Sequence, residues 1–154
     1  MKLSKNLSLA EVVRSESAKR NDVDNTPTAA HIENLKKLAN NVFQPIRDHF
    51  KKPILISSGY RSEKLNRLVP GTSITSQHSQ GEALDIDMDG TKITNKQVFD
   101  FIKDNLVFDQ LIWEHGTDAN PAWVHVSYES SGKQRKQVLK AVKKNNTTKY
   151  IPYT

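Results

Sequence analysis

Apolar residues recur at helical spacing over residues 28–50, returning every three or four positions. This pattern predicts a long amphipathic helix that packs one face against the core. Pro45 lies within it and should kink the helix or end its first segment, because proline has no backbone N–H to donate. Nearer the N-terminus, Ser8 and Glu11 have the spacing of a capping box, which predicts a short helix over about residues 9–17.

Strand and helix signals alternate in the middle of the chain. Residues 53–58 form a short, strongly apolar run typical of a strand, and a turn then leads into a short helix that ends near Leu68. Thr94 and Gln97 form a second capping box, which predicts a helix that runs to about residue 105.

A strict alternation of apolar and acidic residues occupies residues 83–87. Side chains point to opposite faces at successive strand positions, so Leu84 and Ile86 share one face while Asp85 and Asp87 share the other. One face is therefore expected to belong to the core and the other to a polar site.

Two further strands are predicted at residues 108–114 and 122–128, joined by the polar loop 115–121. The simplest arrangement is an antiparallel hairpin, in which Glu114 comes near His125. Helices that precede the strands, with one helix between them, favour an α+β fold with a small antiparallel sheet and flanking helices.

Length and composition are those of one soluble domain. The chain has 154 residues, enough for a single hydrophobic core, and no apolar run approaches the roughly 20 residues of a membrane span. The first residues lack the apolar core of a secretion signal. Cysteine is absent, so any metal ion must be held by nitrogen and oxygen.

Positive charge is concentrated in residues 132–154, which hold seven basic residues and no acidic residue, whereas the rest of the chain is close to neutral. Such a tail suits an anionic polymer, but a solvated, partly helical chain end explains it equally well. No motif or interleaved aromatic residues indicate specific nucleic-acid binding. We expect residues 1–131 to form the domain, with the tail either part of it or flexible.

His78, Asp85 and His125 could supply two imidazoles and one carboxylate to a single divalent metal ion. Three such ligands are typical of catalytic zinc, which keeps a further position for water. A polar loop that begins at Pro70 reaches His78, and Gly81 would ease the turn back to the strand that carries Asp85. The spacing of His78 and Asp85 alone is a weak signal, since polar turns often carry ordinary histidines.

Hydrolysis at such a site also needs a proton acceptor and a positive charge that faces the substrate carbonyl. Glu114, next to the hairpin loop, is the best-placed acceptor, with His115 as the alternative. Arg61, at a strand-to-helix turn, could contact the carbonyl oxygen or a terminal carboxylate. The other residues that could bind the substrate or line the site are Ser76, Tyr60, Trp123 and Tyr128.

Ordinary structural roles compete with each of these assignments. Asp85 could be an exposed strand residue, although acids are disfavoured in strands. Asp87 fits a loop cap better than a fourth ligand, and Trp123 would more often belong to a core than to a cleft. His31 and His49 fit the polar side or end of the long helix.

Taken in order along the chain, these motifs resemble those of the zinc D-Ala-D-Ala carboxypeptidase family, which also includes peptidoglycan endopeptidases. The similarity spans about residues 8–130 and is greatest to the small single-domain members common in bacteriophage genomes. The motifs are Ser58-Gly59-Tyr60-Arg61-Ser62, Ser76-Gln77-His78, Gly81-Glu82-Ala83-Leu84-Asp85, Asp109-Gln110-Leu111-Ile112-Trp113-Glu114 and Trp123-Val124-His125-Val126-Ser127.

The resemblance implies the fold that this family shares with the zinc domain of hedgehog proteins. It also implies one Zn²⁺ ion per chain on His78, Asp85 and His125, with Arg61 as the substrate contact and Glu114 as the base. Several family members carry the base three residues before the last histidine. Ala122 occupies that position here, so the base must come from the preceding strand.

The function expected from these features is a monomeric zinc peptidase that cleaves peptidoglycan stem peptides, as a phage-type lytic enzyme. The alternative is a non-catalytic phage structural or wall-binding module that retains the fold. Without a leader peptide, we expect synthesis in the bacterial cytoplasm, followed by release through a holin-type pore or assembly into a virion.

Overall fold

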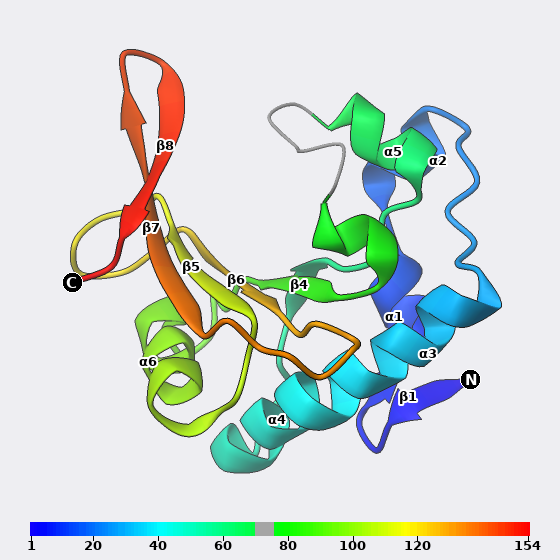
Figure 1. The fold of residues 1–154 in the computed structure, drawn as a ribbon, viewed down its shortest axis with the longest axis horizontal. Helices are drawn as coiled ribbons and strands as arrows, with labels where there is room; N and C mark the ends of the chain where they lie inside the picture. Colours follow the sequence, from blue (N-terminus) through cyan, green and yellow to red (C-terminus); the bar gives the residue numbers. More distant parts are fainter. Residues whose placement is uncertain (70–75) are drawn as a thin grey trace.

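The computed structural model describes residues 1–69 and 76–154, which form a twisted six-stranded sheet with helices packed against it (Figure 1). The helices are α1 (Leu9–Val13), α2 (Glu16–Arg20), α3 (Ala29–Leu38), the π-helix η1 (Ala39–Phe43), α4 (Gln44–Phe50), α5 (Glu63–Leu68), the 3₁₀ helix η2 (Gln77–Gln80) and α6 (Asn95–Asn105). The strands are β1 (Lys2–Ser4), β2 (Leu7–Ser8), β3 (Ile56–Ser58), β4 (Ala83–Ile86), β5 (Gln110–Glu114), β6 (Trp123–Ser127), β7 (Gln137–Lys144) and β8 (Thr147–Pro152).

The main sheet has the strand order β3-β4-β6-β5-β7-β8, and β1 and β2 form a separate small hairpin. The predicted α+β class is confirmed, as is the antiparallel hairpin of β5 and β6. One pair differs from the expected antiparallel pattern, because β5 and β7 run parallel. The chain returns after β6 to the start of β5, where the Arg135 side chain and backbone bind Asp109, and β7 therefore starts beside β5 and runs in its direction.

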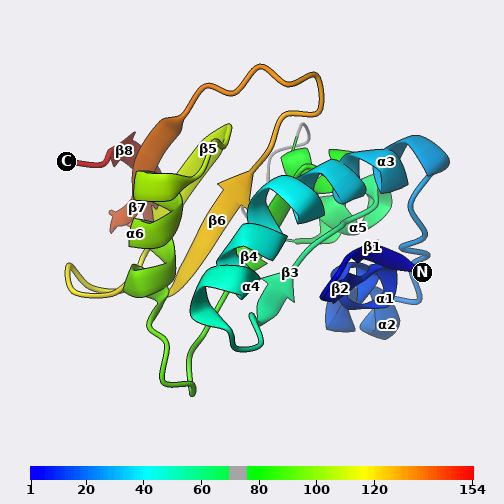
Figure 2. The same ribbon diagram turned by 90° about the horizontal axis from the view of Figure 1, so that it is seen from below.

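Helices α3, α4 and α6 cover one face of the sheet (Figure 2). Strand alternation turns Leu84, Ile86, Val124 and Val126 toward them, and all four are fully buried. The odd-numbered neighbours on β4 and β6 consequently face the opposite side, which carries the polar residues. The predicted division of the strand at residues 83–87 into a core face and a polar face is therefore correct.

The long amphipathic helix is present as three consecutive helical segments. The type of helix changes near Pro45, where an interruption was expected. The π-helix η1 lies between α3 and α4, and Pro45 stands in the first turn of α4. The backbone N–H of Gln44 reaches back to the carbonyl of Ala39, one residue further than in an α-helix. The π-turn before the proline accommodates the missing backbone N–H, so the helical segment continues without a break.

Both predicted capping boxes are formed, but the first helix is shorter than expected. Ser8 caps α1, which ends at Val13, and a second helix, α2, starts after Ser15. The chain breaks between them because Arg14 is extended and the Ser15 side chain accepts a hydrogen bond from the N–H of Ala18. The box at Thr94 begins α6 as predicted.

The basic C-terminal segment is not helical, which corrects the expectation of a solvated, partly helical end. It forms the β7–β8 hairpin, which projects at one edge of the sheet in Figure 1. Asn145 and Asn146 both have positive φ, as the tight turn of a two-residue hairpin requires. Four of the six residues of β8 are β-branched or aromatic, which favours a strand despite the charge pattern that suggested a tail.

A predicted strand and a predicted loop have other bounds in the structure or fall outside its described part. The strand predicted from residue 53 begins at Ile56, and the polar loop predicted from Pro70 falls largely on residues 70–75, which lie outside the described residues. Within residues 1–69 and 76–154, no helix has the length and hydrophobicity needed to span a membrane.

Candidate metal centre

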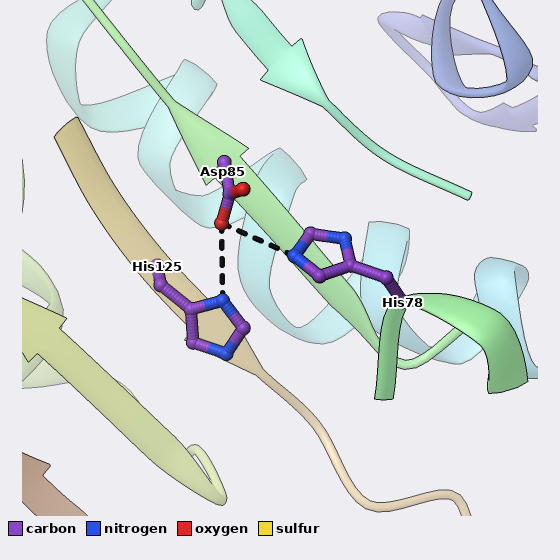
Figure 3. A group of neighbouring side chains, drawn as sticks. All are labelled: His78, Asp85 and His125. Carbon is purple, nitrogen blue, oxygen red and sulfur yellow. Dashed lines mark hydrogen bonds and ion pairs between the residues drawn. The ribbon is translucent and has the colours of Figure 1, made fainter. Parts of the chain in front are cut away.

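Three separate elements bring His78, Asp85 and His125 together on the polar face of the sheet (Figure 3). Asp85 on β4 and His125 on β6 are directly opposite each other across an antiparallel pair. Asp85 Oδ1 lies 3.0 Å from His125 Nδ1 and 3.2 Å from His78 Nε2. One nitrogen or oxygen atom of each residue lies within 4.8 Å of those of the other two, which is a spacing suited to a shared ion.

The ring of His78 is held in one orientation by its surroundings. Its Nδ1 lies 2.7 Å from the backbone carbonyl of Gly59, so that Nε2 points at Asp85. The hydroxyl of Ser76 accepts a hydrogen bond from the His78 N–H and caps η2. Gly81 ends η2 with a φ of +75°, which confirms the expected turn back to β4.

Gly59 is required where it stands. A Cβ atom built on it would lie 2.4 Å from the carbonyl oxygen of Val12, so a side chain would push the strand away from α1. The Gly59 carbonyl is the group that orients His78, and such a shift would therefore reach the site directly.

The protonation of these side chains favours a cation between them. Burial is the main cause that lowers the pKa of His78, so its ring is neutral at pH 7. Because a carbonyl only accepts, the single proton is on Nδ1, toward Gly59, and the lone pair of Nε2 faces the carboxylate of Asp85. Two electron-pair donors 3.2 Å apart repel each other unless a positive charge lies between them. This donor set fits a divalent metal ion.

The carboxyl of Asp85 is ionised and ready to act as a ligand. Burial raises the pKa of Asp85, but its interactions with His78 and His125 outweigh burial and hold the pKa well below its usual range. A positive ion shared by these side chains would favour the carboxylate further.

Glu114 lies on the same face, at the end of β5 opposite Trp123 on β6. It is only 6% exposed, and burial raises the pKa of Glu114 to about 7, against opposing effects of His125 and Arg61. A carboxyl with such a pKa can both accept and donate a proton near neutral pH, as a general base must.

Arg61 is the cation nearest to the centre. Its Nη2 lies 3.6 Å from Asp85 Oδ2 and its Nη1 lies 3.4 Å from Asn66 Oδ1, while its backbone N–H donates to the carbonyl of His78. Within the described part of the chain, its Nε has no hydrogen-bond partner. Burial lowers the pKa of Arg61, but a guanidinium remains charged at neutral pH. Its donors are thus not saturated by these long contacts.

Comparison with protein-family models gives a match to peptidase M15 over residues 5–127. The chain belongs to the peptidase M15 family. The match covers most of the chain and contains the three candidate ligands, Glu114 and Arg61, and membership of a peptidase family implies a peptide substrate. A comparison with curated proteins gave no match.

The candidate centre of this M15 peptidase lies in a cavity of about 1200 Å³. Ser76 and Trp123 line it, and so do Arg61 and His115. His115 begins the hairpin loop with a positive φ, and its ring lies 5.6 Å from that of Trp123.

Tyr60, Tyr128 and Asp87 have structural contacts in the fold. Tyr60 is among the cavity residues, but its ring is only 4% exposed in the core and its hydroxyl lies 3.0 Å from His31 Nδ1. Tyr128 packs against the core. Asp87 caps the loop after β4 by accepting from the N–H of Asp89 and from Asn95, which confirms the loop-capping prediction.

Sequence reasoning missed the contribution of the C-terminal hairpin to this cavity. Leu139 on β7 and Thr148 and Tyr150 on β8 line it, together with Arg135 in the segment that leads to β7. The signal that could have revealed the hairpin is the pair Asn145-Asn146 between alternating strand residues. The pairing of β7 with β5 could not be deduced, because parallel strands are not joined by a short turn that can be recognised in the sequence.

Proposed function

We propose that this M15 peptidase is a zinc enzyme that cleaves peptidoglycan stem peptides. The observation that carries the proposal is that His78 Nε2 and His125 Nδ1 lie 3.2 Å and 3.0 Å from the same oxygen of the Asp85 carboxylate. Neutral imidazoles and a carboxylate are ligands that zinc commonly takes in hydrolytic sites. We propose His78, Asp85 and His125 as the ligands of one Zn²⁺ ion.

A zinc ion held there supplies Lewis-acid activation of water and of the peptide carbonyl. Glu114 takes the proton from the attacking water and passes it to the nitrogen of the leaving amine. Its raised pKa suits both transfers, and its position at the end of β5 places it on the same face as the ligands. Burial of this acid without a strong ion pair is costly, which supports a chemical role over a structural one.

Arg61 binds substrate oxygen through the donors that its long contacts leave available. A planar guanidinium can stabilise the negative charge that develops on the carbonyl oxygen, or form a bidentate pair with a terminal carboxylate. Ser76 and Trp123 line the cavity where the rest of the peptide would lie. The bond that is cut is either the terminal D-Ala-D-Ala bond or an internal L-Ala-D-Glu or cross-bridge bond.

The alternative of a non-catalytic wall-binding module predicts a retained metal ion without hydrolysis. A metal ion that only staples the fold would need neither a proton acceptor with a pKa of about 7 nor an unsaturated buried guanidinium. These two groups favour the enzyme. Its proposed setting is the bacterial cell wall, reached from the cytoplasm after phage-encoded pore formation or as part of a virion.

The test is mass analysis of fragments released from defined stem peptides and from purified peptidoglycan by the zinc-loaded chain. We expect new amino groups at one type of bond, loss of this activity with a chelator, and its return with added Zn²⁺. Activity that survives both chelation and Glu114→Ala would refute the proposal. Metal binding without any release of fragments would favour the non-catalytic module.

A further inference from the structure

The β7–β8 hairpin shares the sheet face that carries the candidate centre. Cross-strand pairing aligns Trp123 with Glu114, Glu114 with Ala141, and Ala141 with Tyr150, so that one row crosses β6, β5, β7 and β8. Residues directly opposite each other on neighbouring strands point to the same face. Tyr150 therefore stands on the face of Glu114, two strands away.

A second row reaches the ligands themselves. His125 pairs with Ile112, and Ile112 pairs with Leu139 on β7. Ile112 and Leu139 both line the cavity, and Ala141, which is buried, supplies only a methyl group between Glu114 and Tyr150. Along these two rows the floor between the centre and the hairpin is apolar and low, so small side chains of a peptide fit above it, while Gln110, Gln137 and Arg135 also line the cavity.

Tyr150 rises at the far edge of this floor. It lines the cavity, although its side chain is 52% exposed and is not consumed by core packing. Partial burial, followed by the charges of Glu114 and Asp85, raises the pKa of Tyr150. Its neighbour Ile151, 43% exposed, alternates to the opposite face of β8.

We propose that the β7–β8 hairpin is a wall of the substrate groove and that Tyr150 is a specificity-determining residue that binds the peptide beyond Glu114. This inference rests on the proposed peptidase function and adds a binding subsite to it. The hairpin lies outside residues 5–127, the part of the chain that matches the M15 family, so the family match does not assign it a role.

The geometry sets the length of peptide that can reach the wall. Neighbouring strands are about 4.8 Å apart, so Tyr150 stands roughly 10 Å from Glu114, and an extended peptide advances about 3.3 Å per residue. About three residues beyond the cut bond are needed to contact Tyr150. The wild-type chain should therefore prefer peptides that extend this far on one side of the cut bond.

The experiment compares Tyr150→Ala with Ile151→Ala, a matched control on the same strand with similar exposure and the opposite orientation. Two series of stem-type peptides are used, lengthened one residue at a time on either side of the cut bond. The ratio of kcat/KM between long and short peptides is measured for the zinc-loaded full chains, together with the Kd of each peptide by calorimetry. Tyr150→Phe tests whether the ring itself is the contact.

We expect Tyr150→Ala to reduce the preference for long peptides roughly tenfold, mainly through KM and Kd, because an aromatic contact of this size is lost. Ile151→Ala should keep the wild-type preference, and Tyr150→Phe should restore most of what the alanine variant loses. Zinc content and thermal stability should be the same in all variants, since both residues are exposed.

The outcomes separate this inference from the proposed function. Equal Kd values and equal length preference in wild type and Tyr150→Ala would overturn the hairpin wall, even if the chain hydrolyses every peptide. Absence of hydrolysis by wild type with length-dependent binding through Tyr150 would overturn the peptidase proposal and retain the wall. A chain that binds neither series overturns both.

Discussion

Asp85 and Glu114 are two buried carboxyl groups on one face of the same sheet, and their pKa values shift in opposite directions. Asp85 faces two imidazoles and Arg61, and its pKa falls well below the usual range. No ion pair with Glu114 is formed within the described residues, and burial raises its pKa to about 7. The two residues are almost equally exposed, at 9% and 6%.

The difference teaches that partners, and not burial alone, decide what a buried acid can do. A carboxyl beside two imidazoles and a guanidinium stays ionised and can hold a metal ion, whereas one without a strong partner keeps its proton until near neutral pH and can transfer it. Two acids whose environments separate their pKa values in this way are the pair expected in a hydrolytic site.

Replacing the ionised acid should have the largest effect. Asp85→Asn keeps the shape but removes the charged oxygen that we propose as a zinc ligand, so we expect loss of bound zinc and a fall in activity of roughly 10⁴-fold, because several kcal/mol of transition-state stabilisation disappear. Metal analysis of the purified protein and hydrolysis of stem peptides measure both. Full zinc content in this variant would exclude Asp85 as a ligand.

Replacing the protonated acid should leave the metal in place. Glu114→Gln removes only the proton transfer, so we expect activity to fall by roughly 10³-fold while zinc content stays at one ion per chain. Zinc content and kcat are measured on the same preparation. If activity stays near that of wild type, His115 is the next candidate for the base, and His115→Ala tests it.

The pH dependence of the stability of the metal-free protein tests whether Glu114 is buried without a charged partner. The pKa of Glu114 is higher in the folded chain than in the unfolded chain. Its contribution to the free energy of unfolding is therefore full below about pH 4.5, where both states are protonated, and is lost as the pH rises through about 7. Ionising it in the folded state costs about 3 kcal/mol. In urea unfolding with a chelator, Glu114→Gln should gain about this much over wild type between pH 5 and pH 8; a constant difference would contradict the burial of this charge.

The smallest expected effect comes from replacing Gly59, whose carbonyl orients the ring of His78 beside Asp85. Gly59→Ala places a Cβ atom against the Val12 carbonyl and shifts the oxygen that orients His78. We expect zinc affinity to fall about 10- to 100-fold, as is usual when a group that orients a ligand is disturbed. Competition with a zinc chelator gives the affinity. Gly90→Ala, whose Cβ would meet no atom within 4 Å, is the control for a glycine replacement outside the cavity, although Gly90 has a positive φ and Gly59 does not.

Part of the site could be predicted because its signals are local. Alternation around Asp85 separates a core face from a polar face, and the capping boxes at Ser8 and Thr94 depend on residues three positions apart. The β5–β6 hairpin could be predicted because its two strands follow each other in the sequence and are joined by one polar loop. Neither the pairing of β4 with β6 nor the carbonyl of Gly59 leaves such a mark, since both contacts are between distant segments.

By itself, the sequence determined which residues could bind a metal ion, which faces of the strands are apolar and where the helices begin. Only the tertiary structure decided that His125 lies opposite Asp85, that the hydroxyl of Tyr60 meets His31, and that the basic end of the chain pairs with β5 beside Glu114. The reason is physical. Side-chain alternation and capping are set within a few residues, whereas strand order is set by the packing of the whole chain.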